Sequence, residues 1–245
     1  ISCFYNMFAL SIVIPLYNEE LRLKKSLPAL RNFIKKNKKN KIEVIFVSDG
    51  STDKTNLIIE SFKISGVANF KKKFIKYKKN IGKGFAVKKG VLEATNEWVL
   101  LCDTDLSVKP DQFINWYNNK MLYSKRIAYY GSREHKKSII KASEYRIFLG
   151  FFFKKLIKYM FNIKLGDTQC GFKVFNKSYS KKIFKKIKSH RFAFDVELTL
   201  LLSKQNITIK ELPLKWIHKE GSKLSFLKDV PKMLVDIILI RIRYF

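Results

Sequence analysis

The residues with the clearest chemical potential are two aspartates one position apart, Asp103 and Asp105, which follow the apolar run 98–102. In an extended backbone, side chains two positions apart point to the same side, so both carboxylates can face one hard cation. Mg²⁺ or Mn²⁺ held in this way would keep open positions for a diphosphate and neutralise its developing charge. Taken alone, such a pair is more often two loop aspartates that cap the following helix, and only the surrounding motifs favour the metal site.

Two further turns carry residues of chemical interest. Residues 49–53, Asp-Gly-Ser-Thr-Asp, follow a buried apolar run, and residues 82–84 read Gly-Lys-Gly. The first could be only a turn with a helix N-cap, and the second only a loop with a solvated lysine. Alternatively, the glycine backbone of the second could approach a phosphate closely while Lys83 supplies positive charge.

The elements around these turns alternate between strand and helix. Apolar runs ended by turn residues predict strands at 9–16, 42–47, 74–77 and 98–102, with helices between them. This alternation favours an α/β fold with a parallel sheet, in which ligands bind outside the carboxyl ends of the strands. We therefore expect Glu19, Asp49 and Asp103 to converge in one cleft.

The second half of the chain is less regular. Residues 127–131 and 207–212 are strand-like, and residues 147–161 and 226–243 carry apolar side chains at helical spacing with basic residues beside them. We expect these two helices to lie in the plane of a membrane surface; the alternative is that their apolar stripes pack on the protein's own core. No run of 18 uncharged apolar residues predicts a conventional spanning helix.

Composition excludes some classes of protein. The 245 residues are 47% apolar, which excludes global disorder. The three cysteines lie far apart in the sequence, so we expect neither a disulfide framework nor a zinc site. The net charge is +30, and only eight of the 50 basic residues are arginine, whereas nucleic-acid readers more often enrich arginine. Such a surface attracts phosphates and anionic lipid headgroups.

Taken together, the motifs resemble the inverting family 2 glycosyltransferases of GT-A fold. The matching segments are residues 14–20, 47–53, 80–86 and 103–105, in the family's order and spacing. Residues 131–133, 167–173 and 191–197 look like the dolichyl-phosphate β-glucosyltransferase branch of that family. The resemblance covers about residues 9–225 and implies a Rossmann-like mixed sheet flanked by helices. Outside this domain, we expect a leader at residues 1–8 and, from the helical spacing, a C-terminal amphipathic helix at residues 226–245.

The resemblance also implies roles for the matching positions. The residues that would border the nucleotide base and ribose are Pro15, Tyr17, Glu19 and Asp49, with Lys83 nearby. Asp103 and Asp105 would bind the metal and the diphosphate, and Asp167 matches the family's candidate catalytic base. Two features depart from the pattern: Ser48 replaces the first aspartate of the usual Asp-Asp-Gly-Ser turn, and the hydrophobic N-terminal anchor of the eukaryotic enzymes is not seen in this sequence.

The chemistry itself bears on Asp167. A lipid phosphate has a second pKa of about 6, so much of it is ionised at neutral pH and positioning two anionic substrates is the larger problem. Asp167 could therefore orient the site as much as accept a proton, or only cap a turn. A phosphate acceptor also needs a cationic clamp, for which the candidates are Arg133, Arg146, Lys173, Lys215 and Lys223, with Arg133 favoured by its motif.

The sequence thus predicts a membrane-associated enzyme that moves glucose from UDP-glucose to dolichyl or another polyprenyl phosphate, with Mg²⁺ or Mn²⁺ as cofactor and no nucleic-acid partner. It would face the cytoplasm, at a bacterial inner membrane or at the endoplasmic reticulum. GDP-mannose as donor is the alternative within the same class. In a different class, the chain would be a non-catalytic basic protein that binds membrane or nucleic acid.

Overall fold

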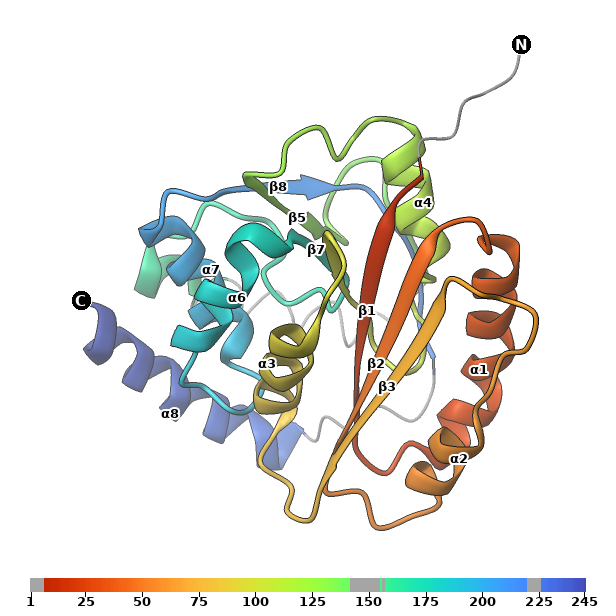
Figure 1. Ribbon diagram of the computed structural model, residues 1–245. Helices are drawn as coiled ribbons and strands as arrows, with labels where there is room; N and C mark the ends of the chain where they lie inside the picture. The colour runs from red at the N-terminus through yellow and green to blue at the C-terminus, as the bar shows by residue number, and fades with distance from the viewer. Residues whose placement is uncertain (1–6, 142–154, 156, 220–225) are drawn as a thin grey trace.

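A seven-stranded mixed sheet forms the centre of the computed structural model, which describes residues 7–141, 155, 157–219 and 226–245 (Figure 1). The strand order is β3-β2-β1-β4-β7-β5-β8. The strands are β1 (Ala9–Leu16), β2 (Lys41–Asp49), β3 (Phe70–Tyr77), β4 (Trp98–Leu101), β5 (Ile127–Gly131), β7 (Lys173–Asn176) and β8 (Thr208–Leu212). A separate two-stranded sheet pairs β6 (Ile139–Lys141) with β9 (Lys215–Ile217).

One strand of the large sheet runs against the others. The pairs β1–β2, β2–β3, β1–β4 and β5–β8 are parallel, whereas β7 is antiparallel to both β4 and β5. The predicted α/β architecture with a mixed sheet is confirmed. The insertion of β7 has a consequence for the site, because it brings the segment before β7 to the end at which β4 finishes.

Helices cover both faces of the sheet. On one face lie α1 (Glu20–Lys36), α2 (Thr55–Ser61) and α4 (Asp111–Asn118), and on the other lie α3 (Lys83–Glu93), α6 (Lys177–Lys186) and α7 (Phe194–Lys204) (Figure 1). Alternation along β1 explains the two cores: Ile12 packs with the first group, and Val13 packs with the second. Strands covered on both faces are apolar throughout, which is why the sequence shows them as continuous runs.

The last helix, α8 (Phe226–Tyr244), has two apolar faces. Its inner face places Met233, Ile237 and Ile240 against the protein, where the two isoleucines share a cluster with Ile157 and Phe161. Its outer face exposes apolar side chains at Leu234, Val235, Ile238, Leu239 and Ile242. The alternative that the apolar side chains of this segment pack on the protein's own core therefore holds for one face of the helix only. Among the described residues, no helix is both long and apolar enough to cross a bilayer.

The sequence pattern predicted the first four strands at their correct places, but several other elements were not predicted. Strands β1 and β5 begin and end where they were expected, whereas α4, β6, β7 and β9 were not predicted. The predicted helix at 147–161 falls mostly outside the described residues; within it, 157–161 are helical, and Ile157 and Phe161 are buried.

A buried carboxylate ties together the amino ends of the central strands. Glu43 on β2 is 1% exposed and accepts hydrogen bonds from the hydroxyl of Ser11 on β1 and from the backbone and hydroxyl of Thr95, while Lys73 on β3 lies 3.1 Å away. Burial alone would raise the pKa of Glu43, but these hydrogen bonds outweigh it, and the pKa lies below its ordinary value.

We predict that Glu43→Gln lowers the free energy of unfolding by about 2–4 kcal/mol at neutral pH, because it uncouples Lys73 and weakens a buried network. A carboxyl whose pKa is lowered by folding stabilises above its unfolded pKa and loses that contribution as the pH falls through the folded value. The variant should therefore lose less stability than the parent as the pH falls from about 5 to about 3. Urea denaturation at several pH values measures both effects.

The matched control is Glu60→Gln, which breaks the exposed pair of Glu60 with Lys76. Its effect should be below about 0.5 kcal/mol, because exposed ion pairs contribute little. Equal losses for the two variants would contradict the structural role of Glu43.

Candidate active site

The loops after β1 and β2 are joined by reciprocal hydrogen bonds at the carboxyl end of the sheet. Asn18 adopts a positive φ of 50°, its backbone N–H donates to the hydroxyl of Ser51, and its side-chain oxygen accepts from the backbone of Thr52. Ser48 donates to the same Ser51 hydroxyl over 2.9 Å. The serine that departs from the family turn is thus buried and satisfied. Tyr17 remains 40% exposed beside this junction.

Asp49 holds the next loop in place. Its carboxylate accepts hydrogen bonds from the side chain of Asn80 and from the backbone N–H groups of Ile81 and Gly82, at 2.8–2.9 Å. The residue is 2% exposed. In this structure, therefore, Asp49 fixes the β3–α3 loop, and a direct contact with a nucleotide stays a prediction.

The glycines of the 82–84 motif are required for packing. A Cβ at Gly82 would lie 2.4 Å from the carbonyl oxygen of His190, and one at Gly84 would lie 2.6 Å from the Cβ of Phe194. The N–H of Phe85 also donates to the His190 carbonyl. The backbone of residues 189–194 therefore covers both glycines at the start of α3, which argues against a direct contact of either glycine with a phosphate. The charge of Lys83 is the remaining feature of the motif that could act on a phosphate.

The Asp-x-Asp motif lies in the turn that follows β4, and a common direction of its two carboxylates stays a prediction. Thr104 is buried, and its hydroxyl donates to the carbonyl oxygen of Pro15 at 2.8 Å, which anchors the turn to the end of β1. Asp103 and Asp105 on either side are partly exposed. Asp105 accepts a hydrogen bond from the backbone of Ser107, and Asp103 accepts one from Lys83 Nζ at 2.6 Å.

The segment before β7 packs directly on Asp103. A Cβ at Gly171 would lie 2.0 Å from Asp103 Oδ2, so no side chain fits there while Asp103 keeps its position. The contact joins the 167–173 segment to the carboxylate pair across about 70 positions of sequence. Sequence reasoning did not single out Gly171, although the glycine lies in a quoted motif.

Arg133 and Asp167 form a bidentate ion pair beside this contact. Arg133 Nε and Nη2 donate to the two carboxylate oxygens at 2.7 and 2.8 Å, and the backbone N–H groups of Arg133, Gln169 and Cys170 donate to the same carboxylate. Burial would raise the pKa of Asp167, but the charge and hydrogen bonds of Arg133 outweigh it, so the pKa is lowered. Asp167 is therefore an ionised, fully engaged carboxylate, which favours an orienting role over proton abstraction.

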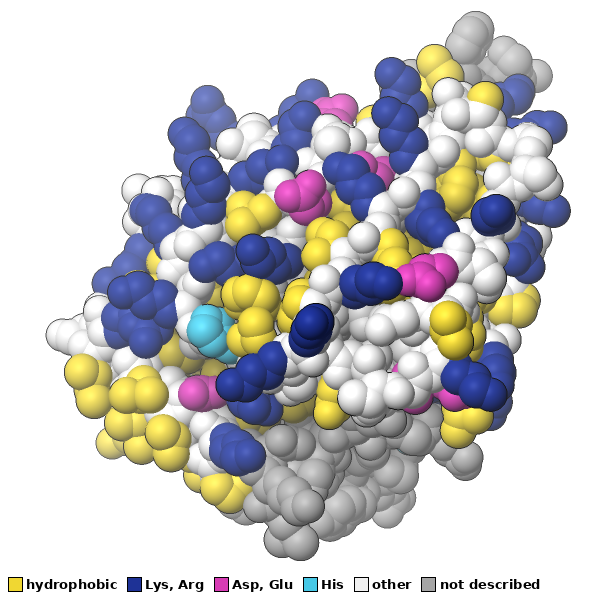
Figure 2. All heavy atoms as spheres, turned by 60° about the horizontal axis from the view of Figure 1, so that its bottom comes forward, with side chains coloured by type: hydrophobic (Ala, Val, Ile, Leu, Met, Phe, Trp, Pro, Cys, Tyr) yellow, Lys and Arg dark blue, Asp and Glu magenta, His cyan; other side chains and the backbone are white. Residues whose placement is uncertain are grey.

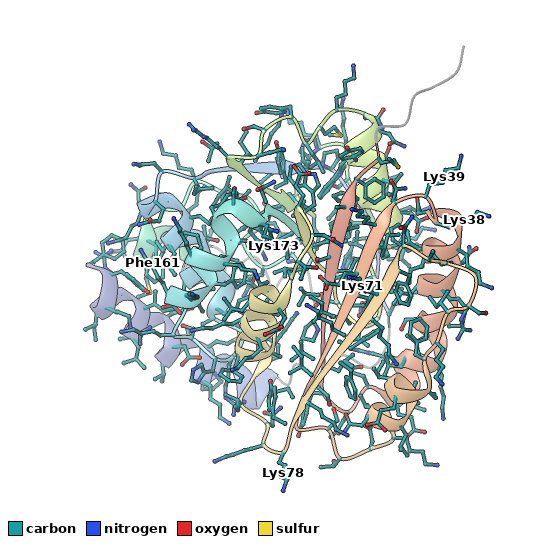
Figure 3. All side chains as sticks on the ribbon, in the orientation of Figure 1. Lys38, Lys39, Lys71, Lys78, Phe161 and Lys173 are labelled. Atoms are coloured by element: carbon teal, nitrogen blue, oxygen red, sulfur yellow. The ribbon has the colours of Figure 1, made fainter. Side chains whose placement is uncertain are left out.

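Lys173 lies in the interior, unlike the surface lysines. It is fully buried, and its Nζ donates to Asp195 Oδ1 and to the carbonyl oxygen of Cys170, both at 2.6 Å. Figure 3 shows it in the middle of the molecule, whereas Lys38 and Lys78 project outward. This geometry does not place Lys173 where an acceptor could reach it. It instead ties β7 and the turn before Gly171 to α7.

The remaining predicted cations differ in position. Arg133 is 37% exposed at its side chain and lies over the ring of Trp216 on β9, with 5.9 Å to the ring centroid. Lys215 is exposed, and because neighbouring strand residues alternate in direction, it points away from Arg133 when Trp216 faces it. Arg146 and Lys223 lie outside the described residues. Of the candidates, Arg133 alone is shown beside Asp167.

The donor set at the Asp-x-Asp motif fits a hard cation. Asp103 and Asp105 offer carboxylate oxygens, and no group of three or more acidic, His or Cys side chains that could hold a metal occurs among the described residues. Mg²⁺ is bound by one or two carboxylates together with substrate phosphates, rather than by a complete cage of protein ligands. Two carboxylates at a sheet end fit that requirement.

The mixed sheet with one antiparallel strand and an Asp-x-Asp turn after β4 define a fold of the GT-A class. The same fold occurs in glucosyl-3-phosphoglycerate synthase from Mycobacterium tuberculosis, crystallised with Mn²⁺, UDP-glucose and phosphoglyceric acid. The TM-score is 0.67 at 15% identity, covering 97% of this chain and 79% of that chain.

The Glycosyl transferase family 2 signature matches residues 11–184, and the chain belongs to this family. The dolichyl-phosphate beta-glucosyltransferase of Saccharomyces cerevisiae is 34% identical over 254 residues, covering 96% of this chain and 75% of that protein. The enzyme of the same name from Homo sapiens is 34% identical over 245 residues with the same coverage. The predicted resemblance is confirmed.

We predict that Gly171→Ala displaces Asp103 and lowers glycosyl transfer by at least about a hundredfold, because a 1 Å misplacement of a reacting group can cost that much. The side chain of Asp103 is partly exposed and can move, so the melting temperature should change little. The control is Gly66→Ala, where a Cβ meets no atom within 4 Å although the backbone φ is +74°. Full activity of Gly171→Ala would contradict the proposed position of Asp103.

Proposed function

We propose that this chain transfers glucose from UDP-glucose to dolichyl or a related polyprenyl phosphate, with inversion at the anomeric carbon. The observation that carries the proposal is the contact of Gly171 with Asp103. It joins the segment that resembles the glucosyltransferase branch to the carboxylates that resemble the family's metal motif. The identity of 34% over 96% of the chain to proteins named for this activity supports it.

On the donor side, Asp103 and Asp105 would hold Mg²⁺ or Mn²⁺, which would neutralise the diphosphate leaving group. Tyr17 offers an exposed ring at the carboxyl end of β1, suited to contact with the nucleoside together with Pro15 and Glu19. Lys83 adds a positive charge next to Asp103. The roles of Pro15, Tyr17 and Glu19 are those that the family resemblance implies, and Glu19 is buried and paired with Arg22 in this structure.

On the acceptor side, Arg133 is the cation suited to the lipid phosphate. Asp167 uses two donors of the guanidinium, which carries five N–H groups, and so leaves others for a phosphate while fixing the plane of the group. A phosphate that is already ionised needs no strong base. Asp167 therefore acts by orienting Arg133, and the nucleophile is the phosphate oxygen itself.

The test of this function is a donor screen with polyprenyl phosphate, scoring the nucleotide released. UDP-glucose should be used at least about tenfold better than GDP-mannose, which corresponds to a difference in transition-state binding of about 1.4 kcal/mol. EDTA and Asp105→Asn should each remove the activity. Asp167→Asn should leave the KM for UDP-glucose within a few-fold and raise the KM for the acceptor.

Preferred use of GDP-mannose would overturn the sugar assignment. Full turnover of Asp105→Asn would overturn the metal role, and a collapse of UDP-glucose binding in Asp167→Asn would move Asp167 to the donor side. RNA binding without any turnover would favour the non-catalytic class instead.

The enzyme would work at a membrane surface, with α8 as a docking element. The outer face of α8 exposes Ile242 at 73% and Ile238 at 51%, and Lys232, Arg241 and Arg243 are exposed on the same helix. Figure 2 shows hydrophobic side chains gathered at the lower left, the side on which α8 runs in Figure 1, next to Lys and Arg. Apolar residues flanked by cations suit an anionic lipid interface.

We predict that the double variant Leu239→Ser, Ile242→Ser weakens binding to phosphatidylserine-containing vesicles by at least about tenfold, since each buried apolar side chain contributes roughly 1.5–3 kcal/mol. The matched control is Leu21→Ser, Leu57→Ser, which removes two leucines that are 74% and 64% exposed on α1 and α2. Vesicle co-sedimentation measures both. Equal losses would show that α8 is not the docking face.

A further inference from the structure

Lys83 and Asp103 form a close ion pair at the centre of the candidate site. Lys83 Nζ lies 2.6 Å from Asp103 Oδ1, with the two side chains 28% and 40% exposed. A separation of 2.6 Å is that of a charge-assisted hydrogen bond, so the ammonium and the carboxylate are each other's counter-ion.

The same Asp103 is a proposed metal ligand, so two cations compete for one carboxylate. Oδ1 accepts the short bond from Lys83, and Oδ2 lies against the backbone at Gly171. A free divalent ion would thus meet a carboxylate that is already neutralised.

We propose that Lys83 is an exchangeable counter-ion that makes the divalent metal and the nucleotide bind as a unit. In the donor-free protein, its ammonium neutralises Asp103. When a nucleotide diphosphate and a divalent cation enter, the ammonium moves from Asp103 to the diphosphate, and Oδ1 becomes available to the cation. No charge is left unpaired in the exchange, because the diphosphate supplies the anion that Lys83 needs. This inference rests on the proposed donor class.

The surrounding structure allows the exchange without backbone movement. Lys83 is the first residue of α3, and its neighbours Gly82 and Gly84 are packed against the 189–194 segment. The N–H of Phe85 is held by the carbonyl oxygen of His190. The helix start is therefore fixed, while the four-carbon stem of Lys83 can turn by side-chain rotation alone.

The experiment measures Mn²⁺ binding directly, by the electron paramagnetic resonance signal of free Mn²⁺, with and without UDP and in the absence of any turnover. In the parent protein, UDP should strengthen Mn²⁺ binding by about tenfold or more, within the usual range of coupling between two ligands. Lys83→Met should bind Mn²⁺ alone at least about fivefold more tightly than the parent and gain less from UDP. Lys83→Arg, which keeps the charge, should resemble the parent.

The matched control is Lys89→Met, which removes an exposed lysine from the same helix; the ammonium of Lys89 lies over the ring of Phe85. It should bind Mn²⁺ as the parent does, so that a general loss of positive charge is distinguished from the loss of this one ion pair. Thermal melting of each variant shows that the fold is retained.

Two results separate the failure of this proposal from the failure of the proposed function. If Lys83→Met binds Mn²⁺ alone like the parent while UDP still strengthens binding, the counter-ion exchange is wrong and the donor class stands. If UDP strengthens Mn²⁺ binding in none of the proteins, the proposed donor is wrong, and the exchange fails with it.

Discussion

The buried ion pair of Lys173 with Asp195 is the interaction on which the site depends. It joins β7 to α7 in the interior, and the same ammonium holds the carbonyl oxygen of Cys170. That carbonyl immediately precedes Gly171, whose backbone lies against Asp103. A buried charge left without its partner is costly, typically 3–5 kcal/mol, so the pair strongly constrains where this turn can lie.

Around this constraint, the site is built from paired charges. Lys83 faces Asp103, Arg133 faces Asp167, and Lys173 faces Asp195. The three pairs differ in exposure, from the wholly buried Lys173 to the partly exposed Arg133 and Lys83. The buried pair fixes geometry, whereas the exposed pairs retain donors and charges that substrates can use. This gradation suits a reaction between two anionic substrates, in which positioning is the main task.

The carboxyl terminus is tied to the same framework. Glu197 on α7 is fully buried and accepts hydrogen bonds from the backbone of Ser189, from Arg243 and from the hydroxyl of Tyr244. It therefore links the segment that packs on the start of α3 to the end of α8. A lipid surface that engaged the outer face of α8 would be held in a fixed relation to Lys83 through these contacts. The proposed docking face and the proposed donor site thus share one rigid support.

The sequence by itself determined the central strands and the place of the Asp-x-Asp pair in the turn after one of them. Continuous apolar runs identify strands covered on both faces, and the polar residues after them mark the turn in which Asp103 and Asp105 are partly exposed and Thr104 is buried. Only the tertiary structure decided the course of β7, the contact at Gly171 and which lysine is buried. These features depend on pairing between segments far apart in sequence, as in the 22 positions between Lys173 and Asp195 or about 70 between Asp103 and Gly171. The local sequence pattern cannot distinguish Lys173 from the exposed lysines. Lys173 differs from them because folding removes water from its ammonium and places Asp195 beside it instead. For α8, likewise, the sequence gives apolar residues at helical spacing, and only packing decides which face is covered and which remains exposed.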